Sequence, residues 1–289
     1  MVMLRKFQWL KSFRSVTAAI SLSVVTVAQA VESPRIVTVG SSVTELVYAL
    51  GAGEQVVAVD VTSQQPLAVH QLPKVGYHRA LSTEGVLSLR PDRVIGSDEM
   101  GPPPVIKQLQ ATQVNVDILT TDASVQNLYQ RIEKTAALLN KPQEGSQLQA
   151  KIQHDIDAAK ARFKGEKPRV LLLLSHNGTP MVAGAGTTAD TLIQLAGGNN
   201  VAASHFERFR QVSDEAVLSM RPDLILITQS SHEAPDESRI LAMQPGLAMT
   251  PAGISKRIVP VDGSLLVGGL GPRVGEAALA LATEFYPES

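Results

Sequence analysis

The sequence predicts an α/β protein with two similar lobes, each a mainly parallel sheet flanked by helices, joined by one long α-helix. In both halves of the chain, short β-branched runs alternate with helical patterns, which is typical of parallel sheets covered by helices. The stretch TEGVLSLRPD at residues 83–92 also returns in the second half as DEAVLSMRPD at residues 214–223. A duplicated unit indicates two lobes, and two lobes imply a cleft between them.

Each half supplies its own set of predicted elements. Buried strands are expected at residues 36–39, 56–59, 93–95, 114–119, 170–174, 224–227 and 258–261. A helix is expected after the first strand of each half, because residues 191–197 echo the apolar pattern of residues 45–51. A closing helix is predicted at 272–285, where the proline suits the first helical turn.

A long helix is predicted between the halves. Five apolar residues recur there at helical spacing: Leu148, Ile152, Ile156, Ala159 and Phe163. A helix over residues 144–164 would be about 30 Å long. We assign residues 143–166 to a linker helix, 31–142 to an N-terminal lobe and 167–289 to a C-terminal lobe; the alternative is an ordinary core helix.

The first thirty residues read as a secretory signal peptide. A basic start is followed by an uncharged run at 15–27 and by the small-residue signal Ala28-Gln29-Ala30. We expect cleavage after about Ala30 and a periplasmic protein; the alternative is a retained amphipathic anchor. The chain has no cysteine, so no lipid-bearing cysteine tethers it to a membrane and no disulfide is expected.

Composition excludes several classes of function. The chain has 26 basic and 27 acidic residues, and four basic residues lie in the signal peptide, so the mature protein is too acidic to grip nucleic acid. The only tryptophan, Trp9, also lies there, which excludes a ligand pocket built on indole stacking. No nucleophile elbow and no histidine pair with zinc spacing occurs. We therefore expect no enzyme and no other metal site.

These features resemble a known family. The signal peptide, the two lobes, the long helix and the paired Glu-x-Val-Leu-Ser-x-Arg-Pro-Asp units look like the periplasmic binding proteins of iron-chelate, cobalamin and haem importers. Residues 75–82 (VGYHRALS) and 174–176 (LSH) resemble the haem-binding (HmuT-type) branch. The resemblance implies a monomer that carries haem to an ABC importer, a permease dimer with its ATPase. An outer-membrane haem receptor system would be an indirect partner.

In this family one glutamate per lobe docks against arginines of the permease. The motif carries that role to Glu84 and Glu215. Each stands two residues after a serine, Ser82 or Ser213, so we expect each in the first turn of a capped helix, facing solvent. The alternative is that the two carboxylates only complement the helix dipoles.

Tyr77 is the leading candidate for a haem iron ligand. It follows a short extended segment, and loops at the strand ends of α/β sheets face the ligand crevice. Tyrosine is a known axial haem ligand, and its anionic oxygen favours ferric iron. Arg79 should point to the same side as Tyr77, whereas His78 should point the other way. The alternative is a tyrosine whose ring packs and whose hydroxyl lies in water.

The second half offers further candidates. Alignment of the repeats places Arg208 opposite Tyr77 and Arg210 opposite Arg79, and arginine is suited to pairing the haem propionates; exposed arginines are also common. His176 follows a predicted strand and is a candidate second axial ligand, or the ligand of a second haem, or an ordinary loop histidine. The glycine-rich loop at 268–272 would approach a flat ligand closely or only begin a helix.

The leading hypothesis is a periplasmic protein that captures ferric haemin in the interlobe cleft and delivers it to an ABC importer. A ferric-siderophore or cobalamin receptor of the same fold is the alternative within the class. An exported haem enzyme or hydrolase is the alternative from another class, and it is less favoured.

Overall fold

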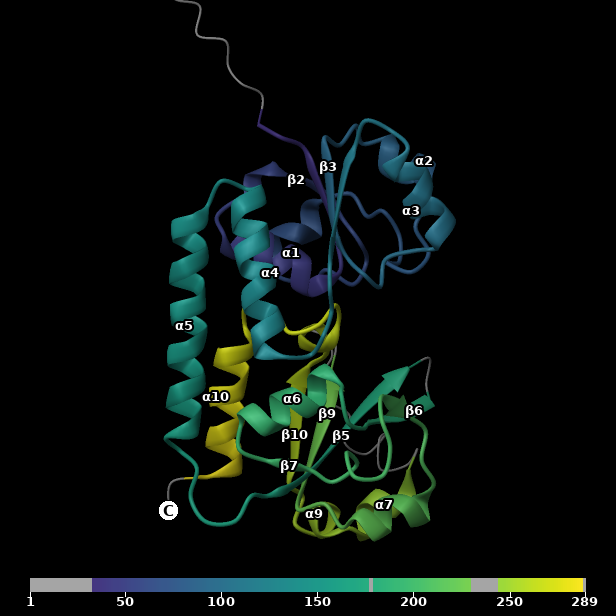
Figure 1. The fold of residues 1–289 in the computed structure, drawn as a ribbon. Coiled ribbons are helices and arrows are strands. Elements are labelled where there is room, and N and C mark those ends of the chain that lie inside the picture. The colour runs from purple at the N-terminus through teal and green to yellow at the C-terminus, as the bar shows by residue number, and fades with distance from the viewer. Residues whose placement is uncertain (1–32, 177–178, 230–243, 288–289) are drawn as a thin grey trace, which may run out of the picture. The chain divides into compact units, whose positions relative to one another are not determined.

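The computed structural model describes residues 33–176, 179–229 and 244–287 (Figure 1). From Pro34 onward the chain forms one compact unit. The expected signal peptide, residues 1–30, lies outside the described residues.

The first half of the chain contributes a four-stranded parallel sheet in the order β2-β1-β3-β4. All four strands predicted for this half are confirmed, and the third continues to Ser97. Their bounds are β1 (Ile36–Val39), β2 (Val56–Val59), β3 (Arg93–Ser97) and β4 (Asn115–Leu119).

Helices cover both faces of this sheet. Val37 and Val39 of β1 pack with α2 and α3, whereas Ile36 packs in the cluster that includes α1 and α4. Alternation along a strand places successive side chains on opposite faces. The helical elements are α1 (Ser41–Ala49), α2 (Thr83–Leu87), α3 (Pro103–Gln110) and α4 (Val125–Leu138), with the 3₁₀ turns η1 (Gly53–Gln55) and η2 (Leu67–Gln71).

The second sheet departs from a simple repeat of the first. Its main path is β10-β9-β5-β6-β8, and β7 also pairs with β5. Strands β10, β9 and β5 pair in parallel, as predicted. The short β7, which was not predicted, also pairs in parallel with β5, but β6 is antiparallel to both β5 and β8. The bounds are β5 (Arg169–His176), β6 (Thr179–Ala183), β7 (Asn199–Asn200), β8 (Phe209–Arg210), β9 (Leu224–Gln229) and β10 (Ile258–Asp262).

Helices also cover both faces of the second sheet. Leu171 and Ile225 pack in the cluster of α7, η3 and α9, whereas Val170 and Leu224 pack in the cluster of α6 and α10. The elements are α6 (Thr188–Leu195), α7 (Asp214–Met220), α9 (Pro251–Ile254) and α10 (Val274–Phe285), with η3 (Pro245–Met249) and η4 (Gly263–Leu266).

The long helix between the two sheets is α5 (Pro142–Lys160). It packs against α4 of the first half and α10 of the second. Its buried residues Ile152, Ile156 and Ala159 belong to a core cluster that also contains residues of both sheets. The predicted apolar face is confirmed at these three residues, but the helix ends at Lys160 rather than 164, so Phe163 lies beyond it. The linker role and the lobe boundaries at 142 and 167 stay predictions.

The repeated Arg-Pro-Asp sequence has a structural role next to the first sheet. Arg90 ends the α2 region with a φ of 49°, a left-handed conformation that non-glycine residues rarely adopt. The side chain of Arg35 donates to the Arg90 carbonyl at 3.1 Å and to the Leu89 carbonyl at 2.9 Å. The backbone N–H of Arg35 donates to Asp92 at 2.8 Å. The start of β1 thus holds the end of the α2 segment.

The second copy makes the same contacts. Arg221 has a φ of 44°, and the side chain of Arg169 donates to the carbonyls of Arg221 at 3.0 Å and Met220 at 2.6 Å. The backbone N–H of Arg169 donates to Asp223 at 3.1 Å. An arginine at the start of each first strand therefore satisfies helix-end carbonyls that would otherwise lack partners.

Within the described residues, no helix combines the length and the apolar character that crossing a bilayer requires.

The close approach of α10 to α5 predicts that Gly275→Val destabilises the protein. A Cβ at Gly275 would lie 2.8 Å from the Ile152 carbonyl oxygen and 2.9 Å from Asp155 Cβ. Overpacking of this kind costs about 1–3 kcal/mol, measured as a loss of unfolding free energy in urea. The control is Ala280→Val on the exposed side of α10, for which we expect a change below about 0.5 kcal/mol. Equal stability of the two variants would contradict the packing.

Candidate functional site

Tyr77 is an exposed side chain on a fixed backbone. The N–H of Val61 donates to the Gly76 carbonyl at 2.9 Å, and the N–H of Ala80 donates to the Tyr77 carbonyl at 2.8 Å. Gly76 has a φ of 95°, which glycine adopts without strain. The Tyr77 side chain remains 42 % exposed, so the loop presents the phenol to solvent.

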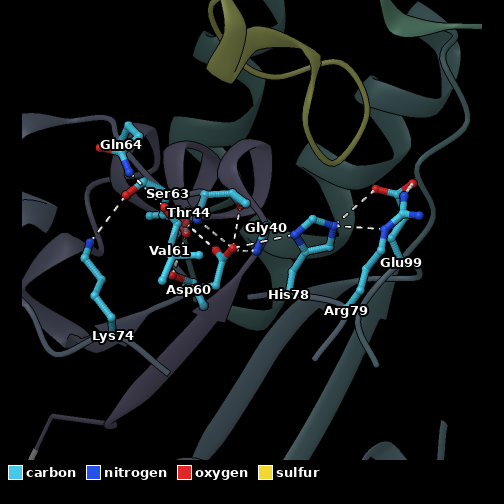
Figure 2. Close-up of polar contacts among 12 residues, drawn as sticks. Gly40, Thr44, Asp60, Val61, Ser63, Gln64, Lys74, His78, Arg79 and Glu99 are labelled. Atoms are coloured by element: carbon cyan, nitrogen blue, oxygen red, sulfur yellow. Dashed lines mark hydrogen bonds and ion pairs between the residues drawn. The ribbon is translucent and has the colours of Figure 1, made fainter. Parts of the chain in front are cut away.

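His78 lies on the inner side of the same loop and is only 3 % exposed. Its Nε2 accepts a hydrogen bond from Arg79 Nε at 3.2 Å, and its Nδ1 lies 3.8 Å from Asp60 Oδ2 (Figure 2). Burial lowers the pKa of His78; the carboxylates of Asp60 and Glu99 oppose that shift, and Arg79 adds to it. The imidazole is therefore neutral near pH 7. The sequence predicted that His78 points away from Tyr77, but the two rings are in contact, with their centroids 4.3 Å apart.

Asp60 is a fully buried carboxylate at the end of β2. Its Oδ1 accepts from the Gly40 N–H at 2.8 Å and from the Ser63 hydroxyl at 2.7 Å. Its Oδ2 accepts from the N–H and the hydroxyl of Thr62, at 3.0 and 2.5 Å. Four donors on one carboxylate offset much of its desolvation cost and leave it little freedom to move.

A chain of buried hydroxyls extends from Asp60 to the first strand. Because an ionised carboxylate only accepts, Ser63 donates to Asp60 and must accept from Thr44, at 2.7 Å. Thr44 in turn accepts from Thr38 of β1, also at 2.7 Å. The polar network thus connects β1, α1 and the loop after β2. Each hydroxyl in it donates toward the Asp60 carboxylate.

The Arg79 guanidinium has partners inside the protein. Its Nη2 donates to Glu99 Oε1 at 2.5 Å, and its side chain is 57 % exposed. It therefore lies beside Tyr77 in sequence but is paired with Glu99, which follows β3. Its predicted contact with a haem propionate stays a prediction.

Arg208 and Arg210 lie next to the antiparallel edge of the second sheet. Arg208 has a φ of 63° and exchanges backbone hydrogen bonds with residues 184 and 185. Arg210 belongs to β8, and its guanidinium carbon lies 5.9 Å from the Phe206 ring centroid. Both side chains are exposed. In the described part of the chain, no hydrogen bond or ion pair joins either one to Tyr77 or Arg79, so their role also stays a prediction.

His176 ends strand β5 and pairs in register with Thr179 of β6. The predicted strand ended at residue 174, so His176 was expected just after it; instead β5 continues through His176. Its side chain lies outside what the structure describes, and its role as an iron ligand stays a prediction.

Glu84 and Glu215 occupy equivalent helix positions. Each lies in the first turn of its helix and is exposed. Ser82 and Ser213 accept from the backbone N–H three residues later, at 3.0 and 3.3 Å, as predicted for N-caps. The N–H of Glu215 itself and the Ser213 hydroxyl lower the pKa of the Glu215 carboxyl, which keeps it anionic.

Arg131 on α4 is a buried cation that the sequence analysis did not identify. Its Nη1 donates to the Gly268 carbonyl at 2.8 Å and to Ser42 Oγ at 3.2 Å, and its Nη2 donates to the Leu270 carbonyl. Burial lowers the pKa of Arg131 to about 10, and Asp98 opposes that shift. The glycine-rich loop therefore approaches the first half of the protein itself: a Cβ at Gly268 would lie 2.9 Å from Ser42 Oγ.

Arg273, next to that loop, reinforces this contact. Its guanidinium donates to both carboxylate oxygens of Glu45 on α1, at 2.8 and 2.7 Å, and to Asp262 at 2.9 Å. The hydrogen bond to Glu45 raises the pKa of Arg273, while burial raises the pKa of Glu45. The Arg273 side chain therefore connects α1 with the last strand.

Weak signals for two of these groups exist in the sequence. Asp60 comes directly after a buried strand, where polar side chains gather at a sheet edge. Arg131 lies three residues after Leu128 and next to Ile132, on the apolar side of its helix. The pairing of Arg273 with Glu45, 228 positions apart, left no local signal.

The described chain is thus a two-sheet α/β protein with an exposed, braced tyrosine and matched glutamates on two capped helices, the features of a solute-binding protein. The family model for periplasmic binding proteins matches residues 36–265. The chain belongs to that family.

Known proteins similar to this chain differ in their cargo. The solved structure of the periplasmic haem-binding protein HutB of Vibrio cholerae is 41 % identical, with a TM-score of 0.81, covering 88 % of this chain and 100 % of that one. An uncharacterised ABC transporter substrate-binding lipoprotein, YvrC of Bacillus subtilis, is 28 % identical over 89 % of this chain and 82 % of its own. A vitamin B12-binding protein of Vibrio parahaemolyticus is 26 % identical over 68 % and 70 %.

Replacement of the buried cation predicts a large loss of stability. Arg131→Met removes the guanidinium donor from the Leu270 carbonyl and leaves the Gly268 carbonyl with the Ser42 hydroxyl as its side-chain donor. Because an unpaired buried group costs about 1–3 kcal/mol, we expect the unfolding free energy in urea to fall by about that amount. Lys134→Met removes an exposed cation from the same helix and should change it by less than about 0.5 kcal/mol. A similar small change in both variants would show that Arg131 does not hold the loop.

Proposed function

We propose that this protein binds ferric haemin in the periplasm and delivers it to an ABC importer. The observation that carries the proposal is Tyr77, an exposed phenol on a fixed loop backed by a buried imidazole. An anionic phenolate is a suitable axial ligand for ferric iron, and the iron itself favours the deprotonated form. The likeness to HutB, at 41 % identity over nearly the whole chain, supports haem as the cargo.

The rest of the proposed site draws on both halves of the chain. Arg79, Arg208 and Arg210 are the proposed partners of the haem propionates, since arginine pairs carboxylates in fork geometry. His176 is the proposed second axial ligand. The ligand would lie in a cleft between lobes at residues 31–142 and 167–289, with α5 as their linker. The proposal assigns no catalytic step to the protein.

Delivery to the importer is proposed to use Glu84 and Glu215. Their exposure, their equal places on α2 and α7, and their identical serine caps support a pair of matched anionic points for arginines of a permease dimer. The similarity to an ABC transporter substrate-binding protein supports this class of partner. The signal-peptide pattern at residues 1–30 supports export, with cleavage proposed after about Ala30 and a monomeric mature protein.

Cobalamin is the second candidate cargo, because a vitamin B12-binding protein is among the relatives. That similarity is 26 % over 68 % of this chain, weaker than the haem-binding likeness on both measures. A corrin brings its own cobalt ligands, so Tyr77 would only line its pocket without binding the metal. The same holds for a ferric siderophore, whose own oxygens bind the iron.

Titration with haemin tests the cargo. We expect the mature protein to bind one equivalent or more with a changed Soret band, and Tyr77→Phe to weaken haemin binding by more than about tenfold, or about 1.4 kcal/mol, because the iron loses its anionic oxygen. His176→Ala should also alter the spectrum. Tyr129→Phe, which removes a hydroxyl bonded to Gln153, is the control and should bind normally. Binding of cyanocobalamin with no response to haemin would reject the haem proposal in favour of the second candidate.

Charge reversal tests the docking. Glu84→Arg combined with Glu215→Arg should abolish haemin uptake through the reconstituted importer, because like charges at an interface cost several kcal/mol. Haemin affinity should stay within about twofold, since neither carboxylate belongs to the proposed haem site. Glu133→Arg, an exposed change on α4, is the matched control. Normal uptake by the double variant, or loss of haemin binding in it, would contradict the assigned role.

A further inference from the structure

His78, the buried imidazole beside Tyr77, is not a proposed ligand of the haem iron or of the propionates. The Tyr77 and His78 ring centroids are 4.3 Å apart with an interplanar angle of 59°. One ring is exposed and the other is buried, so His78 is an inner contact surface of the phenol. Because the two rings are in contact, the position of the His78 ring limits how far the Tyr77 ring can tilt.

The geometry assigns the tautomer of His78. A guanidinium always donates, so the nitrogen that receives the Arg79 hydrogen bond, Nε2, carries the lone pair. The proton of the neutral ring therefore lies on Nδ1, which faces Asp60 Oδ2 at 3.8 Å. This Nδ1 is buried and makes no hydrogen bond within the described residues. The ring thus lies between Asp60 at its Nδ1 edge and the Arg79–Glu99 pair at its Nε2 edge, where Glu99 Oε2 lies 3.9 Å from Nε2.

Both flanking groups are themselves held in place. Asp60 accepts four hydrogen bonds and joins the hydroxyl chain that reaches β1. Arg79 is bound by Glu99 at 2.5 Å. Figure 2 shows His78 between these two groups, with Asp60 on one side and Arg79 and Glu99 on the other. An apolar residue of the same size would fill the volume of His78, but it could not accept a hydrogen bond from Arg79 or present a polar hydrogen to Asp60.

We propose that His78 is a positioning residue that orients the Tyr77 phenol, through its fixed place between Asp60 and the Arg79–Glu99 pair. This inference rests on the proposed function for its consequence at the iron, but the orientation itself belongs to the ligand-free protein. Residues that orient a metal ligand typically change metal affinity by about 10–100-fold when replaced.

The test compares His78→Leu with His78→Gln. Leucine keeps apolar volume and loses both polar edges, whereas glutamine can accept from Arg79 and donate toward Asp60. In ligand-free protein, we expect the Tyr77 ring resonances to shift in His78→Leu and to return toward the native positions in His78→Gln. With haemin bound, we expect the Leu variant to shift the visible charge-transfer band and to release haem about tenfold faster, with recovery in the Gln variant. His205→Leu, in an exposed loop, is the control.

The possible outcomes separate this inference from the proposed function. Native Tyr77 resonances in His78→Leu, or a Gln variant that behaves as the Leu variant does, would overturn the inference even if the protein binds haemin. If haemin does not change the visible spectrum of the native protein, the proposed function fails. The Tyr77 ring resonances of the ligand-free variants would still show whether His78 positions the phenol. If His78→Leu does not fold, Glu99→Ala takes its place; it frees Arg79 from its partner and should shift the Tyr77 resonances in the same direction, and unshifted resonances would overturn the inference.

Discussion

The charge of Arg131 is the constraint on which the arrangement of the two sheets depends. No carboxylate pairs with this buried guanidinium in the described part of the chain, so backbone carbonyls of the loop at 268–270 must meet it. Those carbonyls reach Arg131 because Gly268 and Gly269 both take positive φ values, 81° and 80°. Arg273 then binds Glu45 of α1, and one core cluster runs through both sheets by way of α5 and α10.

A second polar network governs the Tyr77 loop. The exposed phenol is connected, through His78, to a buried carboxylate that β1, α1 and the loop after β2 all hold in place. In a buried polar network, each group without a hydrogen-bond partner lowers stability, whereas a fully bonded network makes the surrounding structure rigid. The Tyr77 phenol is open to solvent, while the His78 ring that contacts it is buried against this network.

Local pattern was enough to predict the seven strands, the long helix and both capped helices, because strand alternation, helical spacing and serine caps are properties of neighbouring residues. The β6–β8 edge was missed because β8 is two residues long and β6 carries a proline, so neither shows a clear period. The sequence offered Tyr77 as the leading ligand candidate, a role that stays a prediction, and it did not predict the contact between the Tyr77 and His78 rings. It did not identify Asp60 or Glu99 as their partners, nor the Arg273–Glu45 pair, since those contacts join segments far apart in the chain.

The Arg-Pro-Asp repeat carries a meaning beyond symmetry. In both copies its arginine takes a left-handed backbone, and its aspartate accepts from the first strand, with no part in the proposed ligand site. These residues join the helix to the sheet in each half and make none of the contacts of the proposed ligand site. Their chemistry is the same whatever molecule is carried, so the repeat defines the scaffold and not the cargo. Within the described residues, differences in cargo would have to arise from side chains such as Tyr77 that face solvent beside the scaffold.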